Sequence, residues 1–413
     1  MSIRLDGDAR QEWRDHWPVV AAAMAGVAMS TINSYSTGVF IEPLEQAFGW
    51  SRAQISMGPA ITAPIIIFMG PVMGAAIDRF GPRRIGLIGV ISVFLLNMLL
   101  STVGPSIWSW FAVWGLIAIA NIFIQPSVWT SAVSGMFSAG RGFALALTLS
   151  GSGIGSLVTP FLVYELTARY GWRMGYVGLA LFWAVVAIPL IYFLFTSVKD
   201  KDRIAGRTPI SFTPRGDGAG KRQLLSRRFI QLAVAGWLIA SVVISLVTNL
   251  VPVLSSSGLT RGEAAAIAPL LGVASITGRL AIGFLLDRMR GTILAAVSVC
   301  LPIATSLLLL GLPGSVPGAA AAVLILGLAL GAELDLVAYL TSRYFGLRNF
   351  GLLFGTIGGL ITLAGAAGPL AMNIVYDATK SYDSALWFYI PICLAASLLF
   401  LFLGPYPHPD DLD

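Results

Sequence analysis

Two related stretches of sequence decide the fold: Gly74-Ala-Ala-Ile-Asp78-Arg79-Phe-Gly81-Pro-Arg83-Arg84 and, 209 residues later, Gly283-Phe-Leu-Leu-Asp287-Arg288. The same offset relates Pro43 to Pro252, Gly49 to Gly258, Ser51 to Thr260, Arg52 to Arg261 and Pro160 to Pro369. The matching positions are glycines, prolines, hydroxyl residues and charges, which do not interchange as aliphatic residues do. They therefore indicate an internal duplication.

The composition places both repeats in a membrane. Of 413 residues, 56% are hydrophobic and only 11% are charged, whereas a soluble domain has about 25% charged residues. The hydrophobic residues form runs of about 20, the length that crosses a bilayer. Disorder and a disulfide scaffold are excluded, since apolar residues dominate and there are two cysteines. The net charge of +6 comes from short loops between the runs, so we expect no nucleic-acid partner.

The apolar runs form twelve predicted spans, at about 17–41, 53–77, 85–103, 108–136, 143–167, 174–197, 229–255, 264–286, 293–313, 318–342, 350–376 and 385–404. One longer polar stretch, 198–228, contains nine Lys and Arg residues and separates two sets of six spans. We therefore expect a six-helix bundle over 1–197, a linker over 198–228 and a second six-helix bundle over 229–413.

Lysine and arginine predict how the chain is oriented. If the N-terminus is cytoplasmic, that side has 20 of these residues and the opposite side has five. The positive-inside rule then predicts that both termini are cytoplasmic. The N-terminal tail lacks a basic segment followed by an apolar run and a cleavage site, so we expect a retained first span in the cytoplasmic (inner) membrane.

Two repeated halves of six helices are typical of the major facilitator arrangement, in which the substrate binds at the midplane between the halves. The stretch after the second span resembles the motif that this superfamily carries between its second and third helices. The resemblance implies a cytoplasmic latch formed by Gly74, Asp78, Arg79, Arg83, Asp287 and Arg288. The predicted fold class is an all-α membrane protein with twelve transmembrane helices in two pseudo-symmetric bundles.

Three ionisable residues lie deep inside predicted spans, where a charge is costly and by default indicates function: Arg279, Glu333 and Asp335. Arg279 stands where the first repeat has Gly70, and its planar guanidinium fits a carboxylate. It could bind a substrate carboxylate or form a structural ion pair with the tenth span. Glu333 and Asp335 point about 200° apart on a helix, so only one readily faces Arg279. Either could carry a proton or form a structural salt bridge.

Uncharged polar residues inside the spans are further candidates for the lining of a substrate cavity: Asn33, Tyr35, Asn121, Gln125, Asn249 and Tyr376. For any one of them, a hydrogen bond between packed helices is an equally good interpretation.

Three segments together resemble the bacterial branch of the monocarboxylate transporter family, near the oxalate:formate antiporters. They are the segment from Gly38 to Ser56 (GVFIEPLEQAFGWSRAQIS), the segment from Gly278 to Arg288 (GRLAIGFLLDR) and the segment from Gly331 to Gly346 (GAELDLVAYLTSRYFG). The resemblance implies proton-linked transport of small monocarboxylates such as lactate or pyruvate. It also implies that Arg279 corresponds to the arginine with which the family holds the carboxylate.

The sequence departs from well-known animal members of that family at two positions. They have an aspartate four residues before the arginine, where this chain has Ser275, and a lysine in the first helix, where it has Tyr35. Glu333 or Asp335 would then have to supply the proton site. Oxalate carriers add a lysine in the eleventh span, but 350–376 contains none. One fixed cation favours monocarboxylates over dicarboxylates.

We therefore expect a secondary active transporter of small monocarboxylates that works by alternating access with proton symport, as a monomer. The alternative is a facilitator or exporter of another organic anion, an aromatic acid or a drug-like solute. A membrane sensor would normally carry a larger soluble domain than 198–228 provides. An enzyme is not expected, nor are a cofactor or a metal, because the two histidines lie at 16 and 408 and no catalytic or metal-binding motif occurs.

Overall fold

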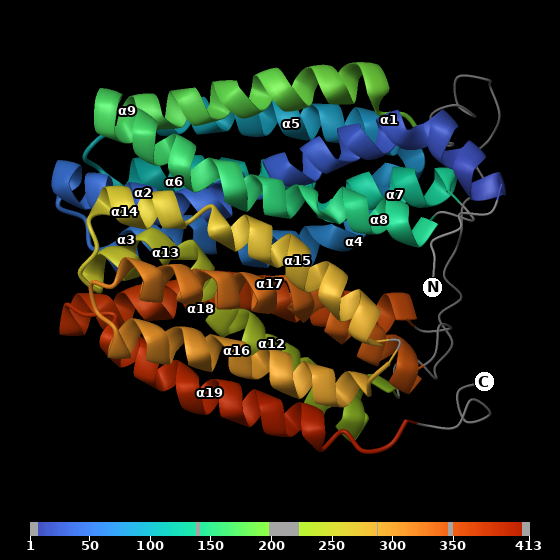
Figure 1. Cartoon of the computed structure of the whole chain (residues 1–413). Coiled ribbons are helices and arrows are strands. Elements are labelled where there is room, and N and C mark those ends of the chain that lie inside the picture. Colours follow the sequence, from blue (N-terminus) through green and yellow to red (C-terminus); the bar gives the residue numbers. More distant parts are fainter. Residues whose placement is uncertain (1–6, 138–140, 198–222, 287, 346–349, 407–413) are drawn as a thin grey trace. The chain divides into compact units, whose positions relative to one another are not determined.

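The computed structural model describes residues 7–137, 141–197, 223–286, 288–345 and 350–406, and the regular secondary structure in these ranges is helical (Figure 1). The helices of the first half are α1 (Gly7–Ser30), α2 (Ile32–Phe48), α3 (Arg52–Ala60), α4 (Thr62–Phe80), α5 (Pro82–Leu100), α6 (Ile107–Ile122), α7 (Pro126–Met136), α8 (Arg141–Leu149) and α9 (Gly151–Leu194). Those of the second half are α12 (Arg227–Thr248), α13 (Leu250–Ser256), α14 (Arg261–Ile267), α15 (Leu270–Leu286), α16 (Gly291–Gly311), α17 (Val316–Phe345), α18 (Phe350–Thr379) and α19 (Asp383–Leu401).

These helices correspond to the predicted spans, although helix and span boundaries differ. Several spans consist of two helices, and α9 covers parts of two spans. The 44 residues of α9 would measure about 66 Å as one helix, twice the thickness of the hydrocarbon core. At Gly171 the backbone leaves the helical conformation, with φ 80° and ψ 166°. This break separates the spans predicted at 143–167 and 174–197.

Ten helical runs in the described part of the chain are long and apolar enough to cross a membrane. Phe143–Leu194 counts once among the ten although Gly171 divides it, and Arg52–Phe80 is not among them. The predicted fold class, an all-α membrane protein, is confirmed.

The internal duplication reappears in the local structure. Gly49 and Gly258, which are 209 residues apart, both have a positive φ, of 70° and 104°, a conformation that residues with a side chain rarely adopt. Two residues later Ser51 and Thr260 each begin a helix with a capping box. The hydroxyl accepts a hydrogen bond from the backbone N–H three residues on, and the side chain of that residue accepts one from the backbone N–H of Ser51 or Thr260.

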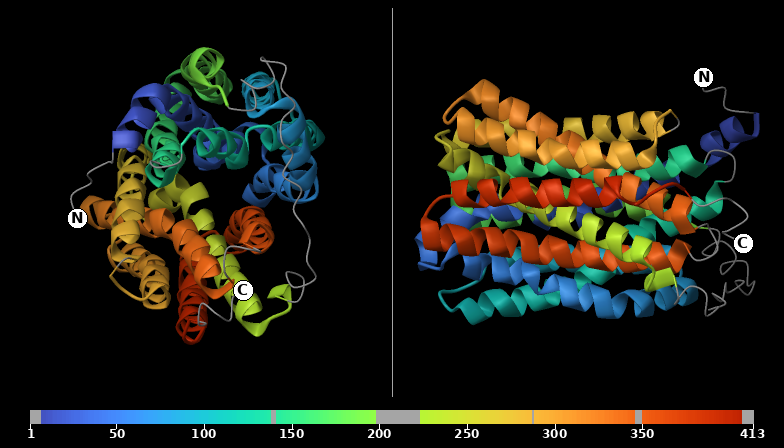
Figure 2. Two further views of the ribbon diagram at one scale, coloured as in Figure 1. Left: turned by 90° about the vertical axis from the view of Figure 1, so that its right-hand side faces the viewer. Right: turned by 90° about the horizontal axis from the view of Figure 1, so that it is seen from below.

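The chain divides into two compact units, one of Met1–Ser36 with Pro64–Thr213 and one of Thr37–Ala63 with Pro214–Asp413. In the first unit α9 packs against α1 and α5, and in the second α17 packs against α15 and α16, and α12 against α18 (Figure 2). Residues 37–63 thus group with the second unit. The division into 1–197, 198–228 and 229–413 remains a prediction, and most of the linker lies outside the described residues.

Small residues hold α15 directly against α17 in the second unit. A Cβ atom added to Gly278 would lie 2.6 Å from the carbonyl oxygen of Leu328, and one added to Gly331 would collide with the carbonyl oxygen of Ser275. Helices in a membrane associate through such close backbone contacts, because lipid chains supply no hydrophobic force between them.

We predict that Gly331→Val forces α15 and α17 apart and lowers stability by about 1–3 kcal/mol, as overpacking of a core does. The measurement is thermal unfolding of the purified protein in detergent. The matched control is Gly283→Val, because a Cβ there has no neighbour within 4 Å. Equal unfolding temperatures for the two variants would contradict the close packing.

Candidate functional site

Arg279 on α15 forms an ion pair with Asp335 on α17, with 3.3 Å between Nε and Oδ2. The close packing of the two helices brings this pair together, since a Cβ on Gly331 would lie only 2.8 Å from the backbone nitrogen of Arg279. The two side chains are 15% and 31% exposed. The pair is therefore recessed, but a further group can still reach it.

The guanidinium of Arg279 is only partly occupied by this contact. Arginine offers five N–H donors, and among the described residues the ion pair to Asp335 is the one partner of this side chain. Its Nε is buried and makes no aligned hydrogen bond. A buried donor without a partner is unfavourable, so the site has unused capacity for an anion.

Glu333, two residues before Asp335, faces a different part of the second unit. Together with Ser298 and Phe400 it lines a hollow of about 10 Å³ among α12, α16, α17 and α19, room for about one water molecule. Among the described residues no hydrogen bond or ion pair involves Glu333. Of the two carboxyl groups it is thus Asp335 that pairs with Arg279, and their roles in transport remain predictions.

Two of the predicted cavity residues in the second unit lie away from this pair. Asn249 is fully buried, and its Oδ1 accepts a hydrogen bond of 2.8 Å from Asn373. Tyr376 packs its ring against the guanidinium of Arg52, 3.8 Å from the ring centre. Neither has a hydrogen bond or ion pair to Arg279 within the described residues.

The other four candidates belong to the first unit. Asn33 is buried and Tyr35 is partly buried. Asn121 and Gln125 flank the break between α6 and α7, where Pro126 starts the second helix. Their side-chain amides make no hydrogen bond among the described residues. Broken helices often provide polar groups for substrates. Of the four candidates in the first unit, Asn121 and Gln125 therefore have the side chains best able to bind a substrate.

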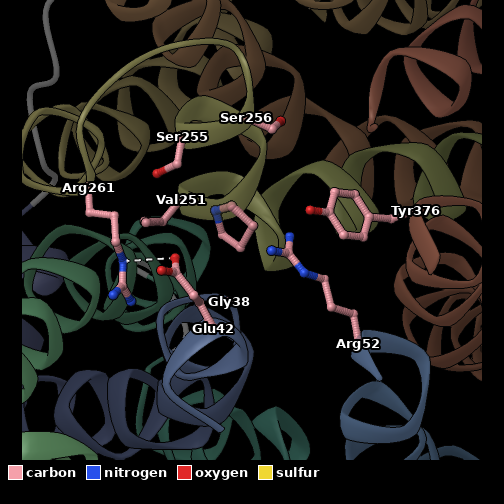
Figure 3. Close-up of a pocket in the computed structure, with 9 residues that line it drawn as sticks. Gly38, Glu42, Arg52, Val251, Ser255, Ser256, Arg261 and Tyr376 are labelled. Carbon is pink, nitrogen blue, oxygen red and sulfur yellow. Dashed lines mark ion pairs between the residues drawn. The ribbon is translucent and has the colours of Figure 1, made fainter. Parts of the chain in front are cut away.

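A second polar centre, the Arg52 cluster, lies within the second unit and consists of Glu42, Glu45, Arg52, Arg261, Asn373, Tyr376, Asp377 and Tyr382. Part of it surrounds a cavity of about 210 Å³ (Figure 3). Arg52 pairs with Glu45 and Arg261 with Glu42, each at 3.2 Å. The two arginines are the equivalent residues of the two repeats. Each arginine has its own carboxylate partner, so both cations are compensated and the two ion pairs suit a structural tie.

Asp377 and Tyr382 extend the cluster to α18 and α19. Both carboxylate oxygens of Asp377 accept from the first backbone N–H groups of α3, at Arg52 and Ala53 (3.2 and 2.8 Å). The hydroxyl of Tyr382 accepts from Arg52 Nη1 at 3.1 Å and donates to Asn373 Oδ1 at 2.9 Å. Asn373 in turn donates to Ser56 on α3 at 2.8 Å. These bonds fix α3 to α18.

The sequence reading missed the Arg52 cluster as a site. Arg52 and Arg261 were identified only as equivalent residues of the duplication, and both follow the duplicated glycine and hydroxyl residue at the same spacing. That duplicated pattern is the signal that could have indicated it. The partners Asp377 and Tyr382 lie far along the chain and have no such pattern.

The predicted latch is described only in part. Arg83 donates from Nη2 to the carbonyl oxygen of Tyr192 at 2.5 Å, and the guanidinium of Arg288 lies 3.8 Å from the ring centre of Phe284. The side chains of Asp78 and Arg79, the surroundings of Gly74 and the whole of Asp287 lie outside what the structure describes. The latch as a whole therefore stays a prediction.

We predict that Tyr382→Phe lowers the free energy of unfolding by about 1–2 kcal/mol, because Asn373 Oδ1 and one N–H of Arg52 lose their buried partner. Tyr376→Phe is the matched control, since Tyr376 contributes its ring and its hydroxyl makes no hydrogen bond among the described residues. Thermal or denaturant unfolding in detergent measures both. A larger loss in the control would contradict the network.

The pH dependence of this difference has a definite sign. Burial raises the pKa of Tyr382 to about 12, although the nearby guanidinium of Arg52 opposes the shift. A raised pKa means that the hydroxyl contributes its stability below about pH 10, the ordinary pKa of tyrosine, and loses it as the pH approaches 12. The Tyr382→Phe difference should therefore be constant between about pH 6 and pH 9.

Comparison with known proteins identifies the family. Residues 23–369 match the family described as Major Facilitator Superfamily. The "MFS transporter asaE" of Aspergillus flavus is 27% identical over 382 residues, 89% of this chain and 81% of that protein. "Monocarboxylate transporter 13" of Bos taurus is 24% identical over 408 residues, 96% of this chain and 92% of that protein. The crystal structure of a D-xylose-proton symporter has a TM-score of 0.75 at 14% identity and covers 94% of this chain and 98% of its own, which shows the shared fold. The chain therefore belongs to the major facilitator superfamily and is a multi-pass membrane transporter rather than an enzyme.

Proposed function

We propose that the protein is a secondary active transporter that moves small monocarboxylates, of the lactate or pyruvate type, by alternating access with proton symport. One observation carries the proposal: the guanidinium of Arg279 lies on a membrane helix, 3.3 Å from Asp335, with donors that no described residue uses. A substrate carboxylate can accept hydrogen bonds from these donors, because carboxylate and guanidinium can form two parallel hydrogen bonds.

The charge balance favours one carboxylate at a time. A charged side chain near the centre of a membrane helix costs about 2.5–3.5 kcal/mol on insertion scales, so a permanent cation there requires a function or a partner. Asp335 is that partner when no substrate is bound. α18 contains no Lys or Arg. That helix therefore offers no cation to pair with the second carboxylate of a dicarboxylate.

Proton coupling follows from the same pair. When a substrate carboxylate takes the place of Asp335 on Arg279, the Asp335 carboxylate loses its cation in a medium that disfavours unpaired charge. It then takes up a proton, so that substrate and proton bind together and leave together. Glu333 is the other candidate proton site, in its hollow of about 10 Å³.

Asn33, Tyr35, Asn121 and Gln125 would contribute polar groups from the first unit, while Asn249 and Tyr376 would act through the Arg52 cluster. The printed name of the Bos taurus relative supports the monocarboxylate class, within which we propose the bacterial branch near the oxalate:formate antiporters. We further propose a monomer in the cytoplasmic (inner) membrane, with both termini cytoplasmic and the latch of Gly74, Asp78, Arg79, Arg83, Asp287 and Arg288 on that side.

A second candidate is export or facilitated movement of a larger organic anion, an aromatic acid or a drug-like solute. The "Fujikurins efflux protein" of Gibberella fujikuroi is 22% identical over 391 residues, 90% of this chain and 78% of that protein. The second unit also has a mainly apolar cavity of about 380 Å³, lined by Trp237, Phe388 and Tyr389 among others. A hydrophobic solute held there would not require Arg279.

We predict that Arg279→Ala abolishes uptake of radiolabelled L-lactate and pyruvate into proteoliposomes with an inward proton gradient, because the carboxylate loses its counter-ion. Arg279→Lys should retain a small fraction, since it keeps the charge without the planar fork. Arg290→Ala, an exposed arginine at the start of α16, is the control and should match the wild type. Uptake that survives Arg279→Ala would favour the second candidate.

We also predict that Asp335→Asn reduces proton-driven accumulation at least about tenfold while exchange of internal for external substrate continues. The amide can no longer take up the proton, whereas exchange needs no net proton movement. Glu333→Gln is the comparison and should keep proton-driven accumulation. The reverse result would move the proton site to Glu333, and full accumulation by both variants would contradict coupling at either carboxyl.

A further inference from the structure

α12 and α19 pack together in the second unit (Figure 1). A groove lies between the first turns of α12 and the last turns of α19. Its volume is about 820 Å³, and its lining is mostly apolar, including Leu225, Ile230, Val234, Leu398 and Phe402. Leu225 is 81% exposed and Phe402 is 72% exposed. An apolar surface open to this extent suits contact with lipid.

The groove has a fixed floor. Gln231 on α12 donates from Nε2 to the carbonyl oxygen of Leu399 on α19 at 2.8 Å. This bond ties the two helices together at the groove through one N–H of the Gln231 amide. Apart from Arg227 and Gln231, the residues that line the groove have hydrocarbon side chains.

One end of the groove is positively charged. Arg227, the first residue of α12, lines it, and the neighbouring Arg228 is also exposed. The lining contains no Asp or Glu, and no described residue makes an ion pair with Arg227. The N-terminus of α12, capped by Ser226, adds the positive end of a helix dipole at the same place.

The position along the helices matches a membrane boundary. Arg227–Thr248 and Asp383–Leu401 are both long and apolar enough to span a bilayer. The groove lies where α12 begins and α19 ends, so its apolar part faces acyl chains and Arg227 lies at the level of the headgroups. Basic pockets between membrane helices are the kind of site that holds anionic lipid headgroups.

We propose that this groove binds an anionic phospholipid, with the headgroup phosphate on Arg227 and one acyl chain along Ile230, Val234 and Leu398. A zwitterionic lipid binds less tightly, because its own ammonium group compensates the phosphate. The site is separate from Arg279 and does not depend on the proposed substrate.

The test is a lipid titration of the purified, delipidated full-length protein, with bound lipid counted by native mass spectrometry. The probes are phosphatidylglycerol and phosphatidylcholine with identical acyl chains. One arginine near a membrane surface contributes about fivefold in affinity. We expect phosphatidylglycerol to bind about fivefold more tightly to the wild type, Arg227→Gln to remove that preference, and Arg227→Lys to keep most of it.

Two further variants test the groove itself. Ala395→Trp places a large side chain at an exposed lining position and should weaken binding of both lipids. Arg290→Gln, an exposed arginine at the start of α16, should bind as the wild type does. Equal affinity for the two lipids, an unchanged preference in Arg227→Gln, or unchanged binding in Ala395→Trp would overturn the proposal.

Discussion

The ion pair between Arg279 and Asp335 is the interaction on which the second unit's chemistry depends. A cation that cannot lose its proton is stable on a membrane helix only if an anion stays close. The chain meets this condition by packing α15 on α17 without intervening side chains, through Gly278 and Gly331. The glycines thus set the distance at which the charges meet. In the proposed transport cycle, a substrate carboxylate and Asp335 then alternate on one guanidinium.

Arg52 and Arg261 are equivalent residues of the duplication, so the backbone before each has the same conformation. Their carboxylate partners do not follow the duplication. Arg52 and Arg261 both follow a left-handed glycine and a capping box. Their carboxylate partners, Glu42 and Glu45, both lie on α2, and the equivalent residues of the second repeat are Val251 and Leu254. One helix therefore supplies the carboxylates for both arginines. Within the second unit, residues 37–48 of α2 are tied to α14, and α3 is tied to α18.

Much of the fold could be predicted from the sequence, because runs of apolar residues and the spacing of Lys and Arg are local properties. The break at Gly171 was placed correctly between two spans for that reason. The partners of single side chains could not be predicted in this way. Helical geometry indicated that one of Glu333 and Asp335 faces Arg279, but the choice depends on the rotation of α17 against α15. Asn249 and Tyr376 remain predicted substrate residues, and their contacts with Asn373 and Arg52 could not be predicted because these partners lie more than 100 residues away in the chain.

The most direct test of Arg279 as a carboxylate site compares each acid with its neutral amide. Proteoliposomes containing the wild-type protein are preloaded with formate, acetate, lactate, pyruvate or benzoate, or with the corresponding amide, and counterflow of the radiolabelled acid is measured. If a carboxylate pairs with the guanidinium, at least one acid drives counterflow and its amide does not, because the amide has no charge to offer. Counterflow driven equally well by an acid and its amide would contradict the site.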